Sequence, residues 1–154
     1  TASQVVVGVA VTNRGTDSDE AAPMLERVKE RCGKMPEEYL VDGGFATLGD
    51  VERIANAGAT LYAPTRAPRG QEREQAQPRR YDPPRVADWR ERMGAAEAQA
   101  IYRDRAAASE CVNAQMSERH GLRQFGVRGL GNALMAVMLV VITHNLLRWI
   151  ALTS

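Results

Sequence analysis

Three short apolar runs alternate with two segments of helical periodicity in the first 64 residues. The runs are Gln4–Val11, Tyr39–Val41 and Thr60–Ala63, and turn-forming residues follow each of them. Between the runs, apolar residues recur at helical spacing in Glu20–Arg31 and again in a segment that begins after Thr47. The pattern predicts the order strand, helix, strand, helix, strand.

Local signals set the ends of the two predicted helices. Pro23 falls in the first turn of one helix, where proline is tolerated, and Gly33 marks its end. Thr47 and Asp50 resemble a capping box at the start of the other helix, which runs to Gly58. Both helices are therefore expected to be short and well delimited.

The composition changes at Thr65–Arg85, which is rich in Arg, Gln, Glu and Pro and has almost no apolar residue to bury. A long helix is predicted from about Val86 to Glu118, weakened at Gly94 by about 1 kcal/mol relative to Ala. The chain thus divides into an α/β part (residues 1–64), a linker or short insertion (65–85) and a helical part (86–154).

The C-terminal segment allows two interpretations. After a short extended piece at Leu122–Val127, a helix capped by Asn132 and ending near Leu152 is about long enough to cross a bilayer. Its uninterrupted apolar run, Ala133–Ile142, is short, and polar residues follow it. We favour a buried core helix, in which His144 is a hydrogen-bonded packing residue rather than a ligand or base.

Charge and cysteine content exclude some classes of function. Lys and Arg number 20 against 19 Asp and Glu, so DNA contact would need local basic patches. Cys32 and Cys111 do not have zinc-site spacing with either histidine, and a reduced, cytoplasmic setting fits them. The N-terminal apolar run has no basic segment before it and does not resemble a signal peptide.

The linker is locally basic. Phosphate contact and simple solvation explain its arginines about equally well. These arginines are Arg66, Arg69, Arg73, Arg79, Arg80 and Arg85.

Two acidic residues are candidates for a site. Asp42 ends an apolar strand, where ligands of α/β sheets collect, although an aspartate there also caps glycine turns. Glu110 lies on a helix of mixed charge and would ordinarily be solvated. Asp17 and Asp19 are best explained as acids near the start of a helix.

The segments around Asp42 and Glu110, taken together, resemble the C-terminal half of bacterial insertion-sequence transposases with a DDE core. Asp42 is followed by Gly43, Gly44 and Phe45, and Glu110 follows the Tyr102-x-x-Arg105 pair on a helix. The resemblance implies that Asp42 and Glu110 are two of three carboxylates that hold two Mg²⁺ (or Mn²⁺) ions for DNA strand cleavage and transfer.

The resemblance also implies DNA contacts for Tyr102, Arg105, Arg119, Arg79 and Arg80, a homodimer, and a nucleoid-associated location without a membrane.

Two positions depart from the family pattern. Four residues rather than three separate Arg105 from Glu110, and Ser117 stands where the family has Lys, with Arg119 and Arg123 as nearby cations.

The implied fold is α/β and ribonuclease H-like, truncated so that its first two strands and the first Asp are absent. Gln4–Val11, Leu40–Asp42 and Thr60–Ala63 would be its third, fourth and fifth strands, followed by the linker and two helices. The remaining strands could not form one continuous sheet, so we expect the chain alone to fold poorly and to be inactive.

Two rival hypotheses remain open. One is a small non-enzymatic protein with a C-terminal transmembrane helix, and the other is a DNA-binding remnant that uses the basic linker without catalysis.

Overall fold

The computed structural model describes residues 3–65, 76–119, 121–122 and 126–154, apart from the side chains of residues 105–108 and 110. Two compact units make up the chain. One consists of Thr16–Arg105, and the other combines the segment up to Gly15 with Ala106–Ser154.

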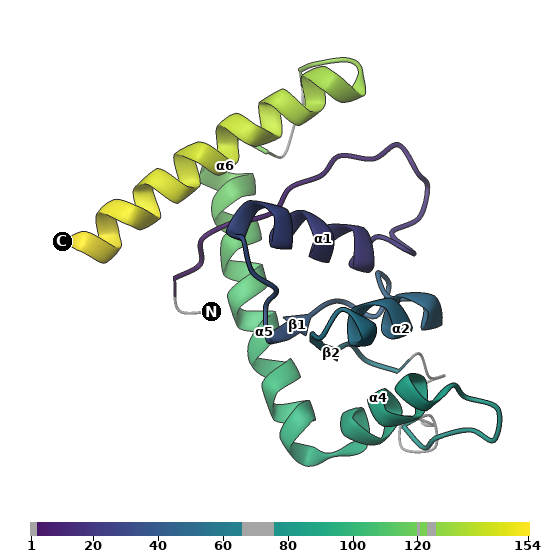
Figure 1. Ribbon diagram of the computed structural model, residues 1–154. Coiled ribbons are helices and arrows are strands. Elements are labelled where there is room, and N and C mark those ends of the chain that lie inside the picture. The colour runs from purple at the N-terminus through teal and green to yellow at the C-terminus, as the bar shows by residue number, and fades with distance from the viewer. Residues whose placement is uncertain (1–2, 66–75, 120, 123–125) are drawn as a thin grey trace. The chain divides into compact units, whose positions relative to one another are not determined.

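The first unit, Thr16–Arg105, is a small α/β assembly in which α1, α2 and α4 gather around a two-stranded sheet (Figure 1). Its elements are α1 (Ala21–Cys32), β1 (Glu38–Leu40), α2 (Leu48–Asn56), β2 (Thr60–Tyr62), α4 (Pro84–Gly94) and the first part of α5 (Ala96–Ala114). The predicted order of elements up to β2 is therefore confirmed, except for the first strand.

The two strands pair in parallel, with Tyr39 opposite Leu61 and Leu40 opposite Tyr62. Parallel neighbours need a crossover connection, and α2 supplies it. The pairing continues one residue further, because the Val41 N–H donates to the Tyr62 carbonyl at 3.0 Å. Both strands therefore end at the same edge of the sheet.

The core of this unit is built from the apolar faces that the helical spacing predicted. Its most buried large side chains come from α1, α2, β2 and α4, and each is at most 2% exposed: Leu25, Val51, Ile54, Leu61 and Val86. Burying each of these side chains is worth about 1.5–3 kcal/mol. Packing between the helices thus stabilises a sheet too small to be stable by itself.

The predicted helix ends are confirmed in detail. The Thr47 hydroxyl accepts from the Asp50 N–H at 3.2 Å, and Asp50 Oδ2 accepts from the Thr47 N–H at 3.1 Å. Gly33 follows α1 with φ of 71°, the left-handed conformation that favours glycine. Asp19, expected near a helix start, accepts a 2.7 Å bond from the Thr47 hydroxyl and so supports α2.

The prediction of one helix over Val86–Glu118 is wrong. The chain leaves helical geometry at Ala95 (φ −77°, ψ 141°), which separates α4 from α5, and a π-helical turn, η1 (Gln115–Arg119), follows α5. Gly94 has the poorest helix propensity of any residue but proline, and a Cβ there would lie 3.3 Å from Ala76 Cβ. The helix therefore breaks next to Gly94, where helix propensity is low and a side chain would come close to Ala76.

The prediction of a strand at Gln4–Val11 is also wrong, because these residues form no strand. Their backbone instead bonds to side chains of α6 (Leu130–Thr153) in the second unit. The Asn145 amide both donates to the Val6 carbonyl and accepts from the Val6 N–H, each at 2.8 Å. His144 Nε2 donates to the Gln4 carbonyl at 2.8 Å, and Arg148 Nε to that of Ser3 at 2.9 Å.

The start of α6 also differs from the prediction. Gly129 is its N-cap, while Asn132 lies inside the helix and donates to the Arg128 carbonyl at 2.9 Å. The extended piece predicted at Leu122–Val127 lies partly outside the described residues, and Leu122, Gly126 and Val127 are not in a strand.

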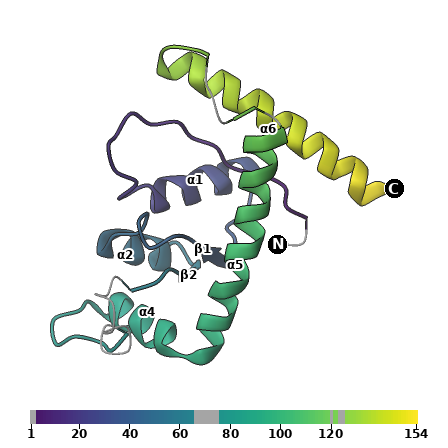
Figure 2. The same ribbon diagram turned by 180° about the vertical axis from the view of Figure 1, so that it is seen from behind.

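The expectation that the last helix is a core helix is not met in this structure. Only Val141 and His144 of α6 are buried, and this single unbroken helix is long and apolar enough, by length and composition, to cross a membrane (Figure 2). The prediction that His144 packs and bonds within the protein is confirmed, since it is 1% exposed. Ten large apolar side chains of α6 are exposed: Leu130, Leu134, Met135, Leu139, Ile142, Leu146, Leu147, Trp149, Ile150 and Leu152.

Candidate functional site

Asp42 lies at the edge of the sheet where both parallel strands end. Its Oδ1 accepts from the Gly43 N–H at 2.8 Å, and its carbonyl accepts from the Phe45 N–H at 3.0 Å. The turn-capping interpretation of Asp42 is therefore confirmed. The side chain is nevertheless exposed, so its carboxylate also faces solvent at the edge where ligands of α/β sheets collect.

The turn after Asp42 packs tightly on Pro64, two residues beyond the end of β2. A Cβ on Gly43 would lie 2.9 Å from Pro64 Cγ, a separation that real Cβ atoms do not tolerate. Glycine is therefore required here for close approach. The contact places the Asp42 turn against Pro64.

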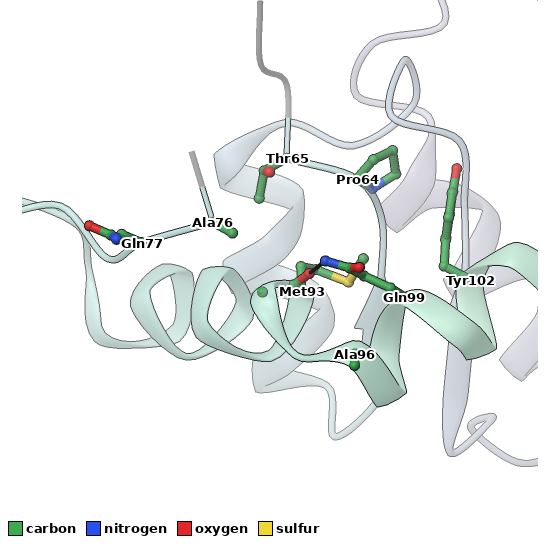
Figure 3. A pocket seen from close by; sticks show the side chains of 9 residues that line it. Pro64, Thr65, Ala76, Gln77, Met93, Ala96, Gln99 and Tyr102 are labelled. Carbon is green, nitrogen blue, oxygen red and sulfur yellow. Dashed lines mark hydrogen bonds between the residues drawn. The ribbon is translucent and has the colours of Figure 1, made fainter. Parts of the chain in front are cut away.

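Pro64 also lines a pocket of about 680 Å³ in the same unit, which we call the Gln99 pocket (Figure 3). Its lining residues are Pro64, Thr65, Ala76, Gln77, Met93, Gly94, Ala96, Gln99 and Tyr102. Tyr102 stands at one end and Gln77 at the other, with Gln99 and Met93 between them. The Gln99 side chain is oriented by a 3.4 Å bond from Nε2 to the Met93 carbonyl.

Among the residues that the structure describes, those that line the Gln99 pocket carry no charged side chain. Its polar groups are the Thr65 hydroxyl, the amides of Gln77 and Gln99, and the phenol of Tyr102. Such groups form hydrogen bonds with neutral donors and acceptors. The described part of the lining is therefore suited to contact with an uncharged polar group.

A second cavity of about 330 Å³, which we call the Arg79 cavity, also includes Pro64 in its lining. The other lining residues are Ala46, Thr47, Leu48, Arg79, Trp89 and Arg90. Arg90 is buried and pairs with Asp82 Oδ2 at 2.7 Å, and the same oxygen accepts from the Arg79 N–H at 2.9 Å. Asp82 thus holds the chain around Arg79 in place at the start of α4.

The structure distributes the predicted site residues over different places. Tyr102 lines the Gln99 pocket, and Arg79 lines the Arg79 cavity. Arg80 is exposed, with its guanidinium carbon 5.6 Å from the centre of the Tyr81 ring. Arg119 is exposed at the end of η1. Tyr102 and Arg79, whose side chains the structure describes, therefore line cavities that include Pro64.

Glu110 and Arg105 both lie on α5, and their side chains are outside the described residues. Arg123, the other cation near the family's Lys position, is outside them too. Asp42 belongs to the unit of residues 16–105, whereas Glu110 belongs to the other unit. The carboxylate pair therefore stays a prediction.

The donor chemistry at Asp42 fits a hard divalent ion, because an exposed carboxylate oxygen is the ligand that Mg²⁺ prefers. Among the residues that the structure describes, no three His, Cys, Asp or Glu side chains are grouped closely enough to hold a metal ion. Asp42 is thus one potential ligand rather than a complete site.

Sequence reasoning missed Gln77, Gln99 and Thr65 as site residues. Gln77 and Thr65 fall in the segment interpreted as a linker, and Gln99 lies on a helix interpreted as solvated. The usable signals were Pro64, which ends a strand, and Gly94, which weakens the helix. Both residues lie where a regular element ends, and both line the Gln99 pocket.

Comparison with known families gave one match. A family model described as "Transposase DDE domain" matches residues 65–150, more than half of the chain. The matched residues include Tyr102 and Glu110 but not Asp42. No curated protein and no solved structure shows significant similarity to the chain.

Proposed function

This chain belongs to the transposase DDE-domain family, and we propose that it contributes to metal-dependent DNA strand cleavage and strand transfer in the transposition of an insertion sequence. The observation that carries the proposal is the position of Asp42. Its exposed carboxylate follows β1 at the carboxyl edge of the sheet, beside a pocket that Tyr102 lines, and the family match covers the helix that carries Glu110.

In this proposal Asp42 and Glu110 hold divalent metal ions, Mg²⁺ or Mn²⁺. When bound, the ions would activate the attacking water or 3′-hydroxyl and stabilise the leaving oxygen. The protein orients Asp42 through the hydrogen bond from the Gly43 N–H and the packing of the turn on Pro64. Tyr102 and Arg79, which line the two cavities that share Pro64, would contact the DNA.

We infer that β1 and β2 are the fourth and fifth strands of a ribonuclease H-like fold. Their parallel pairing through the crossover helix α2 supports this inference. Double-stranded transposon and target DNA would be the substrate, and a homodimer in the cytoplasm, associated with the nucleoid, would be the working form. Since three carboxylates are expected and two are assigned, we expect the isolated chain to bind metal without cleaving DNA.

Calorimetric titration with Mn²⁺ tests the metal ligands directly. We expect Asp42→Asn and Glu110→Gln each to weaken Mn²⁺ binding by at least about tenfold, because each removes an ionised oxygen ligand. Asp104→Asn and Glu118→Gln are matched controls on exposed helix positions and should leave binding unchanged.

A longer polypeptide that supplies the family's first aspartate tests the reaction. We expect Mn²⁺- or Mg²⁺-dependent strand cleavage that either carboxylate variant abolishes and that both controls retain. Cleavage by Asp42→Asn at the wild-type rate would remove Asp42 from the site.

The exposure of α6 favours a second candidate, a membrane-anchored protein without enzymatic activity. The family match extends to residue 150 and so includes most of α6, which supports the transposase assignment of this helix. Retention of the chain in carbonate-washed membranes would favour the second candidate.

A further inference from the structure

Five apolar side chains follow one line along α6, and each is between 52% and 65% exposed. They are separated by alternate steps of four and three residues, and we call them the α6 seam: Met135, Leu139, Ile142, Leu146 and Trp149. A mean step of 3.5 residues keeps apolar side chains on one side of a helix. It is the spacing with which two helices pack side by side at a shallow angle.

The α6 seam lies apart from the side of α6 that holds the N-terminal segment. Successive residues of a helix are about 100° apart, so Val141 and His144, the two buried residues of α6, lie on roughly the opposite side from the seam. His144 bonds there to the Gln4 carbonyl, and Arg148 to that of Ser3. One side of α6 is therefore occupied within the chain, and the seam is left for a partner.

The bonded side of α6 argues against lipid as that partner. A helix surrounded by lipid would carry Arg148 and the irregular backbone of Ser3–Val6 into the hydrocarbon, where such groups are costly. Lipid would also contact every side of the helix equally and would not select a spacing of 3.5 residues. A second helix, in contrast, covers one side only.

The chemistry and the size of the α6 seam fit a second copy of itself. None of its five side chains is charged, so two seams related by a twofold axis meet without repulsion. The ten exposed large apolar side chains of α6 present on the order of 800 Å² of surface, more than the largest apolar patch of a typical monomer. A packed helix covers about half of this, so two copies would bury roughly 1,000 Å² in total, near the lower limit for a specific interface.

We propose that the α6 seam is an interface between two copies of this chain, in which α6 of one copy packs along α6 of its partner. The inference deepens the proposed function, because it names the surface that joins the two copies of the proposed homodimer. It rests on the proposed function only for the role of that homodimer. The small buried area makes the dimer weak and reversible.

Two adjacent leucines offer a matched pair of variants. Leu146 belongs to the seam and is 52% exposed, whereas Leu147 is 51% exposed and lies about 100° further round the helix, off the seam. Leu146→Glu places like charges from both copies in the interface, while the glutamate of Leu147→Glu stays in solvent. Because the two leucines are equally exposed, a change in helix stability or in general apolar character would affect both variants alike.

Sedimentation equilibrium of the 154-residue chain without DNA or metal measures the association. We expect the wild type to show a monomer–dimer equilibrium with a Kd on the order of 100 µM. Leu146→Glu should weaken the association at least about tenfold, because like charges oppose each other across an interface, and Leu147→Glu should change it less than about twofold. Circular dichroism should show the same helix content in all three proteins.

A wild-type chain that stays monomeric up to about 500 µM, well above that Kd, would overturn the proposal. Equal weakening by the two variants would also overturn it, because it would indicate non-specific apolar association, as would assemblies that grow beyond the dimer. Flotation of the chain with phosphatidylcholine vesicles, reduced alike by both substitutions, would overturn it in favour of lipid.

The seam assignment and the proposed function fail separately. A monomeric chain whose Mn²⁺ binding still depends on Asp42 would contradict the seam assignment alone. Dimerisation that Leu146→Glu weakens, together with no metal-dependent cleavage by the longer polypeptide, would contradict the proposed function and leave the seam assignment intact.

Discussion

Tyr39 connects β1 to α1 through a single hydrogen bond. Its hydroxyl donates to the Ala21 carbonyl at 3.1 Å, and its ring packs against the core. Burial, and secondarily the carboxylate of Asp50, raises the pKa of Tyr39 to about 12 from an ordinary value of 10.0. The folded protein therefore favours the neutral, protonated form of the Tyr39 phenol.

This pKa predicts how stability depends on alkaline pH. The unfolded chain loses the Tyr39 proton near pH 10 and the folded chain near pH 12. The contribution is therefore complete below pH 10 and is lost as the pH rises to 12. We expect Tyr39→Phe to lower the free energy of unfolding by about 1 kcal/mol at pH 9, and this deficit to shrink above pH 10 and then reverse before pH 12, because ionisation of the buried phenol destabilises only the wild type.

Urea unfolding followed by the fluorescence of the buried Trp89 at several pH values measures this effect. Tyr81→Phe is the matched control, because Tyr81 is 87% exposed, and its pH profile should follow that of wild type. A constant gap between Tyr39→Phe and wild type from pH 9 to pH 12 would contradict the assignment.

At the scale of elements, the polar residues inside the apolar helix α6 hold another segment of the chain by hydrogen bonds. His144, Asn145 and Arg148 interrupt its apolar sequence, and all three bond to backbone groups of Ser3, Gln4 and Val6. Asn145 presents to Val6 the same donor and acceptor pair that a neighbouring strand would. Side chains of α6 thus form hydrogen bonds with the backbone of a segment whose composition favours a strand.

Removing the Asn145 amide should release this segment. Asn145→Leu leaves the Val6 N–H and carbonyl without their partners, and two hydrogen bonds are worth about 2 kcal/mol in total. We expect amide exchange at Val6 to accelerate roughly tenfold to thirtyfold, measured by hydrogen–deuterium exchange. Thr143→Val is the control, because the Thr143 hydroxyl bonds only within its own helix, to the Leu139 carbonyl. Unchanged exchange at Val6 would show that Asn145 does not hold the segment.

At the scale of the whole molecule, the buried apolar residues are unevenly divided. The main core cluster lies entirely within Thr16–Arg105, and the described part of the other unit buries little beyond Val141 and His144. Each unit contains one tryptophan, Trp89 in the first and Trp149, which is 62% exposed, in the second. The two units can therefore be observed separately.

We expect the isolated chain not to unfold in a single cooperative step. Fluorine NMR of chain labelled with 5-fluorotryptophan, assigned through Trp149→Phe, should show a urea transition for Trp89 and little change for Trp149. Circular dichroism should give a broad transition that matches neither signal alone. Coincident, sharp transitions of both signals in a monomeric chain would contradict this expectation.

The sequence alone determined the features that depend on near neighbours in the chain. Helical spacing, the Thr47–Asp50 capping box, Gly33 and the two paired strands were all predictable, because propensity and capping act over a few residues. The segments around Asp42 and around Tyr102 and Glu110, taken together, were likewise sufficient to indicate the family that the match at residues 65–150 confirms.

Only the tertiary structure decided the features that depend on contacts between distant residues. Gln4–Val11 has the composition of a strand, but a strand needs a partner, and here Asn145 takes that place. The Gln99 pocket arises where Ala76, Pro64 and α5 meet, which no local pattern encodes. Residues from three separate segments form that pocket, so its lining could not be predicted from spacing along the chain.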